Sequence, residues 1–241
     1  MRPRERMAAA QWVPPWLRHQ HEARYAWAAE RCAGLRVLDC ASGNAYGARA
    51  LLQAGAGRVV ALDMAAEAVI EAKAMHAAPR LGIGLADATR LPFADRAFDL
   101  YVSFETVEHV ADDAGYVREA RRVVAPGGTF VCSTPNRALT NPGISIGDKP
   151  FNPFHLREYT RGEIEALLRP AFAEIEWLGQ SIFATLYAKL LHAAGRRRPA
   201  LAVRAHQLRK LAGAPFDTRR KHWPQPYPSS GEPEVLIAVC R

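Results

Sequence analysis

Short runs of apolar residues alternate with segments of helical periodicity along the first 135 residues. Each run has the length of a strand, and helical segments follow the runs at 48–54, at 67–76 and up to about Val124. Strands that alternate with helices of about ten to fifteen residues are typical of βαβ units and a parallel sheet. The pattern predicts an α/β fold with strands at Arg36–Cys40, Arg58–Asp63, Leu81–Ala86, Asp99–Phe104 and Thr129–Thr134.

The pattern changes after Pro135. Residues 136–153 are rich in Asn, Gly and Pro, which predicts a long loop. A segment with helical periodicity at 181–213 interrupts the sheet before its last strand, either as a lid or substrate-docking insertion or only as a solvated helical excursion. The other elements predicted beyond the loop are a helix at Arg161–Arg169 and strands at Glu174–Gly179 and Glu234–Cys240.

Basic residues exceed acidic residues by 32 to 24, which gives a formal net charge of +8. The excess lies mainly in the C-terminal third. It favours phosphates, nucleic acid or an anionic membrane surface as partners, although solvated surface charges would give the same composition. Nine of the basic residues fall in one segment: Arg196, Arg197, Arg198, Arg204, Arg209, Lys210, Arg219, Arg220 and Lys221.

Length and composition predict one cytoplasmic α/β domain. The chain has 241 residues, of which 49% are hydrophobic. Its four cysteines are far apart and form no CxxC pair, which favours reduced, buried thiols over a disulfide framework or a zinc site. The N-terminal segment lacks the apolar core of a signal peptide, and the sequence has no run of about 18 apolar residues that would predict a membrane span.

The strongest chemical signal is the run Val37–Gly47, VLDCASGNAYG. A buried strand that ends in a carboxylate leads into a turn of small residues and then a helix. Open parallel sheets bind ligands at the carboxyl ends of their strands, where such a turn lets a ligand approach the backbone closely. The G-x-G-x-x-G pattern of dinucleotide dehydrogenases is not satisfied, which disfavours a dehydrogenase.

Three acidic residues close three successive predicted strands. Asp63 follows Asp39 by 24 residues, the spacing of a carboxylate that binds a ribose 2′-hydroxyl. Asp87 ends the third strand region and could accept a hydrogen bond from an adenine amine. Each acid alone is also explained as a helix cap or a turn carboxylate, whereas the three together predict an adenosine site at one edge of the sheet.

Four segments resemble the successive signature motifs of class I S-adenosylmethionine-dependent methyltransferases of the methyltransferase type 11 kind: VLDCASGNAYG, ALDMAAEAV, ADATRLPFADRAFDLYVSFETVEHV and REARRVVAPGGTFVCSTPN. The resemblance implies a Rossmann-like, seven-stranded, mostly parallel sheet with an antiparallel last strand and helices on both faces. We expect a single domain over 1–241, with an N-terminal helical flap (1–34), a Rossmann core (35–180), a basic C-terminal helical insertion (181–232) and the last strand (233–241).

The resemblance also implies a cofactor, S-adenosylmethionine, and the residues that surround it. Asp39, Ala41 and Gly43 would surround its methionine part, Asp63 would bind the ribose hydroxyls and Met64 would lie along the adenine. The remaining implied contacts are Asp87 and Ala88 at the adenine edge, and Ser103 and Phe104 on the pocket floor.

The cofactor turn departs from the family pattern in one respect. The family usually has glycine where this chain has Ala41 and Ala45. Because alanine disfavours a positive φ, we expect the turn to keep φ negative at Ala41.

The N-terminal segment HEARYAWA predicts a helix from Glu22 to Arg31. His21, Arg24 and Tyr25 could form a flap over the cofactor carboxylate. The alternative is an ordinary amphipathic helix that buries Tyr25 and Trp27.

The candidate acceptor side is the segment Ser103–Val110, where Glu105, Glu108 and His109 form E-x-x-E-H. If the segment is helical, offsets of three and four place Glu108 and His109 near Glu105. His109 is then a candidate catalytic base, assisted by Glu105. Alternatively Glu105, Glu108 and His109, with His155 from a later segment, hold a divalent metal ion. In a third interpretation, the two glutamates favour a helix N-terminus and His109 packs locally.

The resulting first hypothesis is methyl transfer to a hydroxyl of a small molecule or glycan intermediate, because HEARYAWA, ASGNAYGA and NPFHLREYT resemble methyltransferases of polysaccharide and natural-product pathways. The second is a metal-assisted RNA ribose 2′-O-methyltransferase, since the E-x-x-E-H element also resembles those of small-RNA and ubiquinone-pathway enzymes. A basic segment would supply phosphate contacts to RNA, but no RNA-binding module is recognisable. A protein that binds the cofactor without turnover is a third class.

Overall fold

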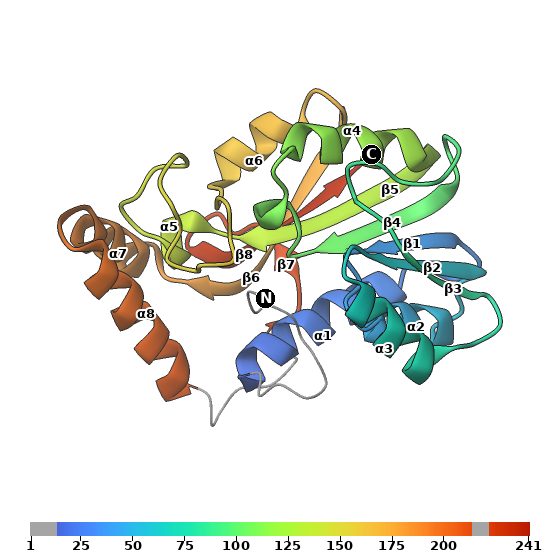
Figure 1. Cartoon of the computed structure of the whole chain (residues 1–241). Coiled ribbons are helices and arrows are strands. Elements are labelled where there is room, and N and C mark those ends of the chain that lie inside the picture. Colours follow the sequence, from blue (N-terminus) through green and yellow to red (C-terminus); the bar gives the residue numbers. More distant parts are fainter. Residues whose placement is uncertain (1–13, 214–221) are drawn as a thin grey trace.

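The computed structural model describes residues 14–213 and 222–241. Within them, eight strands form one twisted sheet in the order β3-β2-β1-β4-β5-β8-β6-β7 (Figure 1). The strands are β1 (Arg36–Cys40), β2 (Arg58–Asp63), β3 (Leu81–Leu85), β4 (Phe98–Phe104), β5 (Val124–Pro135), β6 (Ile175–Phe183), β7 (Gln225–Pro226) and β8 (Glu232–Cys240).

Strand directions agree with the predicted mostly parallel sheet. β1 pairs in parallel with β2 and β4, β2 with β3, and β4 with β5. β8, the last strand in the chain, lies antiparallel between β5 and β6. The prediction of seven strands is one short, because the two residues of β7 pair antiparallel with Leu178 and Gly179 of β6. A strand of only two residues, one of them Pro226, leaves no apolar pattern in the sequence.

Helices cover both faces of the sheet (Figure 1). One buried core lies between the sheet and α1, α2 and α3, and a second between the sheet and α4 and α6. The described helices are α1 (Pro15–Ala29), α2 (Tyr46–Gln53), α3 (Ala66–His76), the 3₁₀ turn η1 (Val107–His109), α4 (Asp113–Val123), α5 (Arg137–Thr140), α6 (Arg161–Leu168), α7 (Thr185–Arg197) and α8 (Pro199–Gly213).

The central strands are apolar runs because both of their faces are covered, as is typical of parallel sheets. Val37, Leu38 and Cys40 of β1 are buried, and so is Asp39 between them. A fully buried carboxylate in the first strand is costly unless it is neutral or paired. Asp39 is therefore the first sign that this strand end has a role besides packing.

Three helical predictions differ from the structure. α1 begins at Pro15 rather than Glu22, since proline fits the first position of a helix. The helix after β4 begins only at Asp113, where the Asp112 side chain accepts a hydrogen bond from the Gly115 amide at 2.8 Å. The predicted long loop contains the short helix α5, capped by Asn136.

The C-terminal insertion forms two helices, α7 and α8, with the predicted break at Arg198. Figure 1 shows them at the end of the sheet that carries α5. Three of the nine basic residues, Arg219, Arg220 and Lys221, lie outside the described residues. All four cysteines are buried free thiols. None of the described helices has the length and hydropathy needed to cross a bilayer.

Candidate active site

The turn after β1 has three residues in left-handed backbone conformations. Ala41 and Ala45 have φ of 61° and Gly43 has φ of 56°, so the expectation of a negative φ at Ala41 is wrong. Hydrogen bonds impose this shape, because the Ser42 amide donates to the Leu62 carbonyl oxygen and the Ala45 amide to that of Ser42, both at 2.9 Å. The space into which a Cβ at Gly43 would project is open, so a ligand can approach the backbone there.

Asp63 lies at the end of β2 beside this turn. One carboxylate oxygen accepts a hydrogen bond from the Gly43 amide and the other from the Ala65 amide, both at 2.9 Å. Since each carboxylate oxygen has two lone pairs, both can still accept from the hydroxyls of a ribose. Met64, the next residue, is exposed. Asp63 thus offers a fixed hydrogen-bond acceptor, and Met64 offers an apolar surface beside it.

Asp39 is buried beneath α1. The Tyr25 hydroxyl donates to its carboxylate at 3.0 Å. Burial, and then the charge of Asp63, raises the pKa of Asp39 to about 7. A positively charged ligand group placed here would favour the ionised carboxylate.

α1 covers this strand end and is also an ordinary buried helix. Tyr25 and Trp27 are both buried, and the Tyr25 ring packs edge-on against Phe104. A Cβ at Gly47 would lie 2.1 Å from the Tyr25 ring, so only glycine permits this approach of α1 to α2. The structure thus agrees with the predicted helix that buries Tyr25 and Trp27, and a flap over the cofactor carboxylate stays a prediction.

Arg24 brings a buried positive charge to the same region. Its Nη1 donates to Oε1 of Gln180 at 2.8 Å, and its Nη2 lies 3.7 Å from Oε1 of Glu105. Its Nε and Nη2 are buried without a hydrogen-bond partner among the described residues. A guanidinium with unused donors suits a carboxylate ligand.

The structure places the other predicted cofactor residues around these groups. The Ala86 amide donates to the Asp63 carbonyl oxygen at 3.1 Å, so the end of β3, with Ala88 just beyond it, adjoins Asp63. Asp87 is exposed, and its Oδ1 accepts from the Thr89 amide and hydroxyl at 2.8 Å. Asp87 therefore also acts as a turn carboxylate, the alternative explanation that the sequence offered.

Ser103 and Phe104, at the end of β4, are both buried. The Ser103 hydroxyl donates to the Cys40 carbonyl oxygen at 3.1 Å. Phe104 lies between Tyr25 and the Arg24 guanidinium, which is 5.8 Å from its ring centroid. These residues underlie the strand ends rather than line an open surface.

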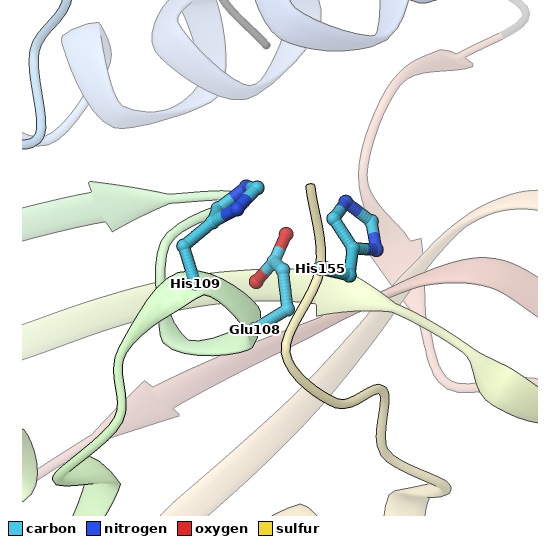
Figure 2. Close-up of side chains that lie close together, drawn as sticks. All are labelled: Glu108, His109 and His155. Carbon is cyan, nitrogen blue, oxygen red and sulfur yellow. The ribbon is translucent and has the colours of Figure 1, made fainter. Parts of the chain in front are cut away.

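Glu108 and His109 lie in the segment after β4, and His155 lies in the later loop. Figure 2 shows that their side chains point toward one another. Their potential ligand atoms all lie within 4.8 Å of one another. Glu105 is not part of this group. It has a φ of 52° and is followed by the 3₁₀ turn rather than an α-helix, so the predicted helical offsets do not apply. Its carboxylate instead accepts from the Ser133 hydroxyl at 2.7 Å.

Glu108 is fully buried. Its Oε2 accepts from the Thr134 hydroxyl at 3.0 Å, whereas its Oε1 has no hydrogen-bond partner among the described residues. Burial, and then the charge of Glu105, raises the pKa of Glu108 above its ordinary value, although His155 opposes the shift.

The two histidines are held by different partners. His109 is partly exposed, and its Nδ1 lies 3.1 Å from the Phe154 carbonyl oxygen. Since only a protonated Nδ1 can donate to a carbonyl, neutral His109 has its lone pair on Nε2. His155 is buried, with Nδ1 2.6 Å from Oε1 of Glu158 and Nε2 3.0 Å from the Asn152 amide.

The donor set fits a divalent ion once the Asn152 amide releases Nε2 of His155. A carboxylate and two imidazoles are common ligands of zinc and other transition metals. The unpartnered Oε1 of Glu108 is the orphaned acceptor that a cation would satisfy. Glu158, which binds the ligand candidate His155 through its other ring nitrogen, has the usual position of an outer carboxylate that orients a metal-binding histidine.

Sequence reasoning did not identify Glu158, Thr134 or Gln180. Glu158 follows His155 by three residues, so the spacing in FHLRE was a usable local signal. Thr134 and Gln180 carried none, because they reach Glu108 and Arg24 only through the pairing of distant strands.

Comparison with known proteins identifies the family. The methyltransferase domain family matches residues 38–132. The chain is 37% identical over 202 residues to a protein described as a probable S-adenosylmethionine-dependent methyltransferase from Mycolicibacterium smegmatis, covering 84% of this chain and 74% of that protein. A ubiquinone biosynthesis O-methyltransferase from Methylobacterium sp. is 35% identical over 129 residues, or 53% of this chain and 51% of that enzyme.

A solved S-adenosylmethionine-dependent methyltransferase from Mesorhizobium loti has the same fold, with a TM-score of 0.55 at 21% identity, over 90% of this chain and 98% of that one. The sheet order, the turn after β1 and the relative that matches most of the chain all agree. The chain belongs to the S-adenosylmethionine-dependent methyltransferases.

Proposed function

We propose that this methyltransferase acts in the cytoplasm and transfers the methyl group of S-adenosylmethionine to a hydroxyl of a small molecule or glycan intermediate. The observation that carries the proposal is the group formed by Glu108, His109 and His155. Glu108 and His109 follow β4, which is the neighbour of β1 in the sheet. A proton-accepting group therefore adjoins the strand end that carries the cofactor turn.

The cofactor is assigned to the ends of β1, β2 and β3. Asp63 binds the ribose hydroxyls, Met64 lies along the adenine, and Asp87 with Ala88 meets the adenine edge. Asp39, Ala41 and Gly43 surround the methionine part, above Ser103 and Phe104. Two buried charges support this orientation, since Asp39 is suited to an ammonium group and Arg24 to a carboxylate.

His109 is the proposed general base. S-adenosylmethionine, when bound, supplies a methyl group on a positively charged sulfur. His109 would accept the acceptor's hydroxyl proton at Nε2, and the bound cofactor would supply its methyl group to the acceptor oxygen. The hydrogen bond from His109 Nδ1 to Phe154 favours the required tautomer.

A divalent ion is the alternative way to activate the hydroxyl. Glu108, His109 and His155 would hold the ion, and Glu105 would take part only if its carboxylate left Ser133. Such an ion lowers the pKa of a bound hydroxyl. The unpartnered Oε1 of Glu108 favours this arrangement. The second candidate function uses such a metal ion. It is methylation of an RNA ribose 2′-hydroxyl, for which the basic insertion would bind phosphates.

The partial relative supports oxygen as the acceptor atom, since that enzyme is named an O-methyltransferase of ubiquinone biosynthesis. Its similarity covers about half of this chain. The relation supports the class of reaction and leaves the acceptor to experiment.

The decisive experiment is incubation of the full chain with methyl-labelled cofactor and fractionated cell extract, followed by mass analysis of the labelled product. Label on an oxygen of a small molecule or glycan supports the proposal. Label on an RNA ribose oxygen supports the second candidate, and label on nitrogen or carbon contradicts both.

A chelator separates base from metal in the same assay. If His109 acts as the base, turnover is unchanged by EDTA and is lost in His109→Asn. If an ion is required, EDTA abolishes turnover, added metal restores it, and His155→Ala reproduces the loss. His192→Ala, an exposed histidine on α7, is the matched control.

A further inference from the structure

Helices α7 and α8 each present apolar residues on two faces. One face packs on the protein, where Ala188, Leu191 and Ala202 form a small core with Leu139 of α5. The other face is unusual because its side chains are large, apolar and between 50% and 68% exposed. These residues are Leu186, Leu190, Leu201, Leu208 and Leu211, here called the leucine face.

The spacing of these leucines shows that they point away from the protein. Leu201, Leu208 and Leu211 lie seven and three residues apart, which places them within about 80° of one another around α8 at 100° per residue. The buried residues Ala202 and His206 lie four apart on the opposite side of the helix.

The same holds for α7. Leu186 and Leu190 lie four residues apart and so share one side of the helix. Ala188 and Leu191 are buried on the other side. Neither stripe of leucines is explained by packing within the described part of the chain.

The charge around the leucine face has one sign. Between Thr185 and Gly213 the sequence has seven Lys or Arg and no Asp or Glu. Lys210 is held by the buried Glu234. The other six basic residues are exposed: Lys189, Arg196, Arg197, Arg198, Arg204 and Arg209.

The two helices are fixed to the body of the protein. His206 and Lys210 both bind Glu234 of β8. At the far end, a Cβ on Gly195 would lie 2.2 Å from the Pro142 carbonyl oxygen, so α7 contacts the backbone after α5 directly. The leucine face thus lies on helices that these contacts hold to the body of the protein.

We propose that α7 and α8 dock on the surface of an anionic lipid bilayer, with the leucine face in the boundary between headgroups and acyl chains and the six exposed basic residues against lipid phosphates. Outward leucines among basic residues are the pattern of helices that lie in a membrane interface, and anionic headgroups attract such residues. The proposal does not depend on the identity of the methyl acceptor.

Two other possible partners of the leucine face account for fewer of these observations. A second copy of this chain in a symmetric dimer would bring six exposed positive charges against six more, without acidic residues on either side to offset them. A nucleic acid would account for the basic residues through phosphate contacts, but it would leave the five exposed leucines in water.

Sedimentation with lipid vesicles tests the proposal. The full chain is mixed with vesicles of phosphatidylcholine alone or of phosphatidylcholine with phosphatidylglycerol. We expect it to sediment with the anionic vesicles and far less with the neutral ones. The double variant Leu201→Asn/Leu208→Asn should bind anionic vesicles about tenfold more weakly, because two apolar side chains no longer enter the interface.

Charge and control variants complete the test. Arg196→Gln/Arg197→Gln should weaken anionic binding about fivefold per residue at low salt. Ile70→Asn, which replaces an equally exposed apolar residue on α3, should change nothing. Thermal unfolding and cofactor binding establish that each variant is folded.

Three results would overturn the proposal. The chain could stay in the supernatant with both vesicle types, or the leucine variant could sediment as the wild type does. Alternatively, the chain could bind a short RNA duplex while the leucine variant does so equally well, which would make this a nucleic-acid surface.

Discussion

Glu108 and Glu234 are both buried glutamates, yet their environments differ in the charge that faces them. Glu234 is 3% exposed, and its carboxylate binds Lys210, His206 and the Gln20 amide. Burial alone would raise its pKa, but Lys210 and His206 outweigh burial and hold the pKa at about 2. Glu108 is 0% exposed, has no ion pair with Lys or Arg among the described residues, and its pKa is raised by burial although His155 opposes the shift.

The difference distinguishes a glutamate with a structural role, Glu234, from one with a proposed role in catalysis, Glu108. Glu234 joins β8 to α8 and α1, and its charge is compensated within the fold. Glu108 is buried at a cost that the described residues do not offset, and burial of an uncompensated carboxylate is rarely retained for stability alone. Exchanges near Glu108 should therefore change turnover, and exchanges near Glu234 should change stability.

The largest expected effect is on turnover. His109→Asn should lower kcat about 100-fold to 10,000-fold, because the proposed base is lost, while the midpoint of thermal unfolding stays the same. His206→Asn is the matched exchange beside Glu234. Loss of the hydrogen bonds from His206 to Glu234 and Tyr187 should lower the free energy of unfolding by about 1–3 kcal/mol. A kcat that falls equally in both variants would contradict the separation.

The second prediction concerns the glutamates themselves. Glu234→Gln should lower the free energy of unfolding by about 2 kcal/mol, because the partly buried Lys210 loses its counter-charge. Glu108→Gln should leave that free energy unchanged or raise it. Chemical denaturation of both variants measures the difference, and equal losses would show that Glu108 is also structural.

The third prediction tests the half-exposed carboxylate beside the cofactor turn. Asp63→Ala should weaken binding of S-adenosylmethionine by about 1–3 kcal/mol through the loss of charge-assisted hydrogen bonds. Calorimetric titration measures the affinity. Asp99→Ala serves as the control, because Asp99 lies near the amino end of β4, away from the strand ends that carry the cofactor turn. An unchanged affinity in Asp63→Ala would place the ribose elsewhere.

The fourth prediction concerns pH. The pKa of Asp39 rises from 3.8 to about 7 on folding, so between these values the folded chain binds more protons than the unfolded chain. Its contribution therefore lowers stability as pH rises through this window, by about 1.4 kcal/mol per pH unit at most.

Glu234 acts in the opposite sense. Its pKa falls from 4.5 to about 2, so its stabilisation is present above pH 4.5 and is lost as pH falls toward 2. Denaturation between pH 4 and 7 should show a smaller decline in Asp39→Asn than in the wild type. An identical decline would show that Asp39 stays ionised in the folded chain.

The sheet could be predicted because each central strand is buried on both faces and so leaves a continuous apolar run. The segment after β4 could not be predicted correctly, because in the alternating pattern a strand is expected to lead directly into a helix. Its left-handed Glu105 depends on hydrogen bonds from its amide to Ser133, a residue on another strand. The better local signal was Asp112, a helix cap with Gly115 three residues later.

The candidate site divides in the same way. Asp39 and Asp63 lie at the ends of strands and the Glu108–His109 pair follows one, so their placement depends on sheet order, which the alternating pattern predicts. The partners of Arg24 and Glu108 come from β6 and β5 and depend on pairings between distant segments. Tertiary contacts of this kind leave no periodicity in the chain.

The left-handed alanines of the turn after β1 have a consequence for how such sequences change over evolutionary time. A left-handed alanine costs about 1–2 kcal/mol relative to its right-handed form, and glycine would remove that cost. Glycine, however, gives the unfolded chain more freedom, worth about 0.4–1 kcal/mol. The second effect offsets about half of the first at positions 41 and 45, so alanine costs only about 1 kcal/mol at each position and the turn keeps its shape. A search pattern that demands glycine at both positions would overlook enzymes with the same turn.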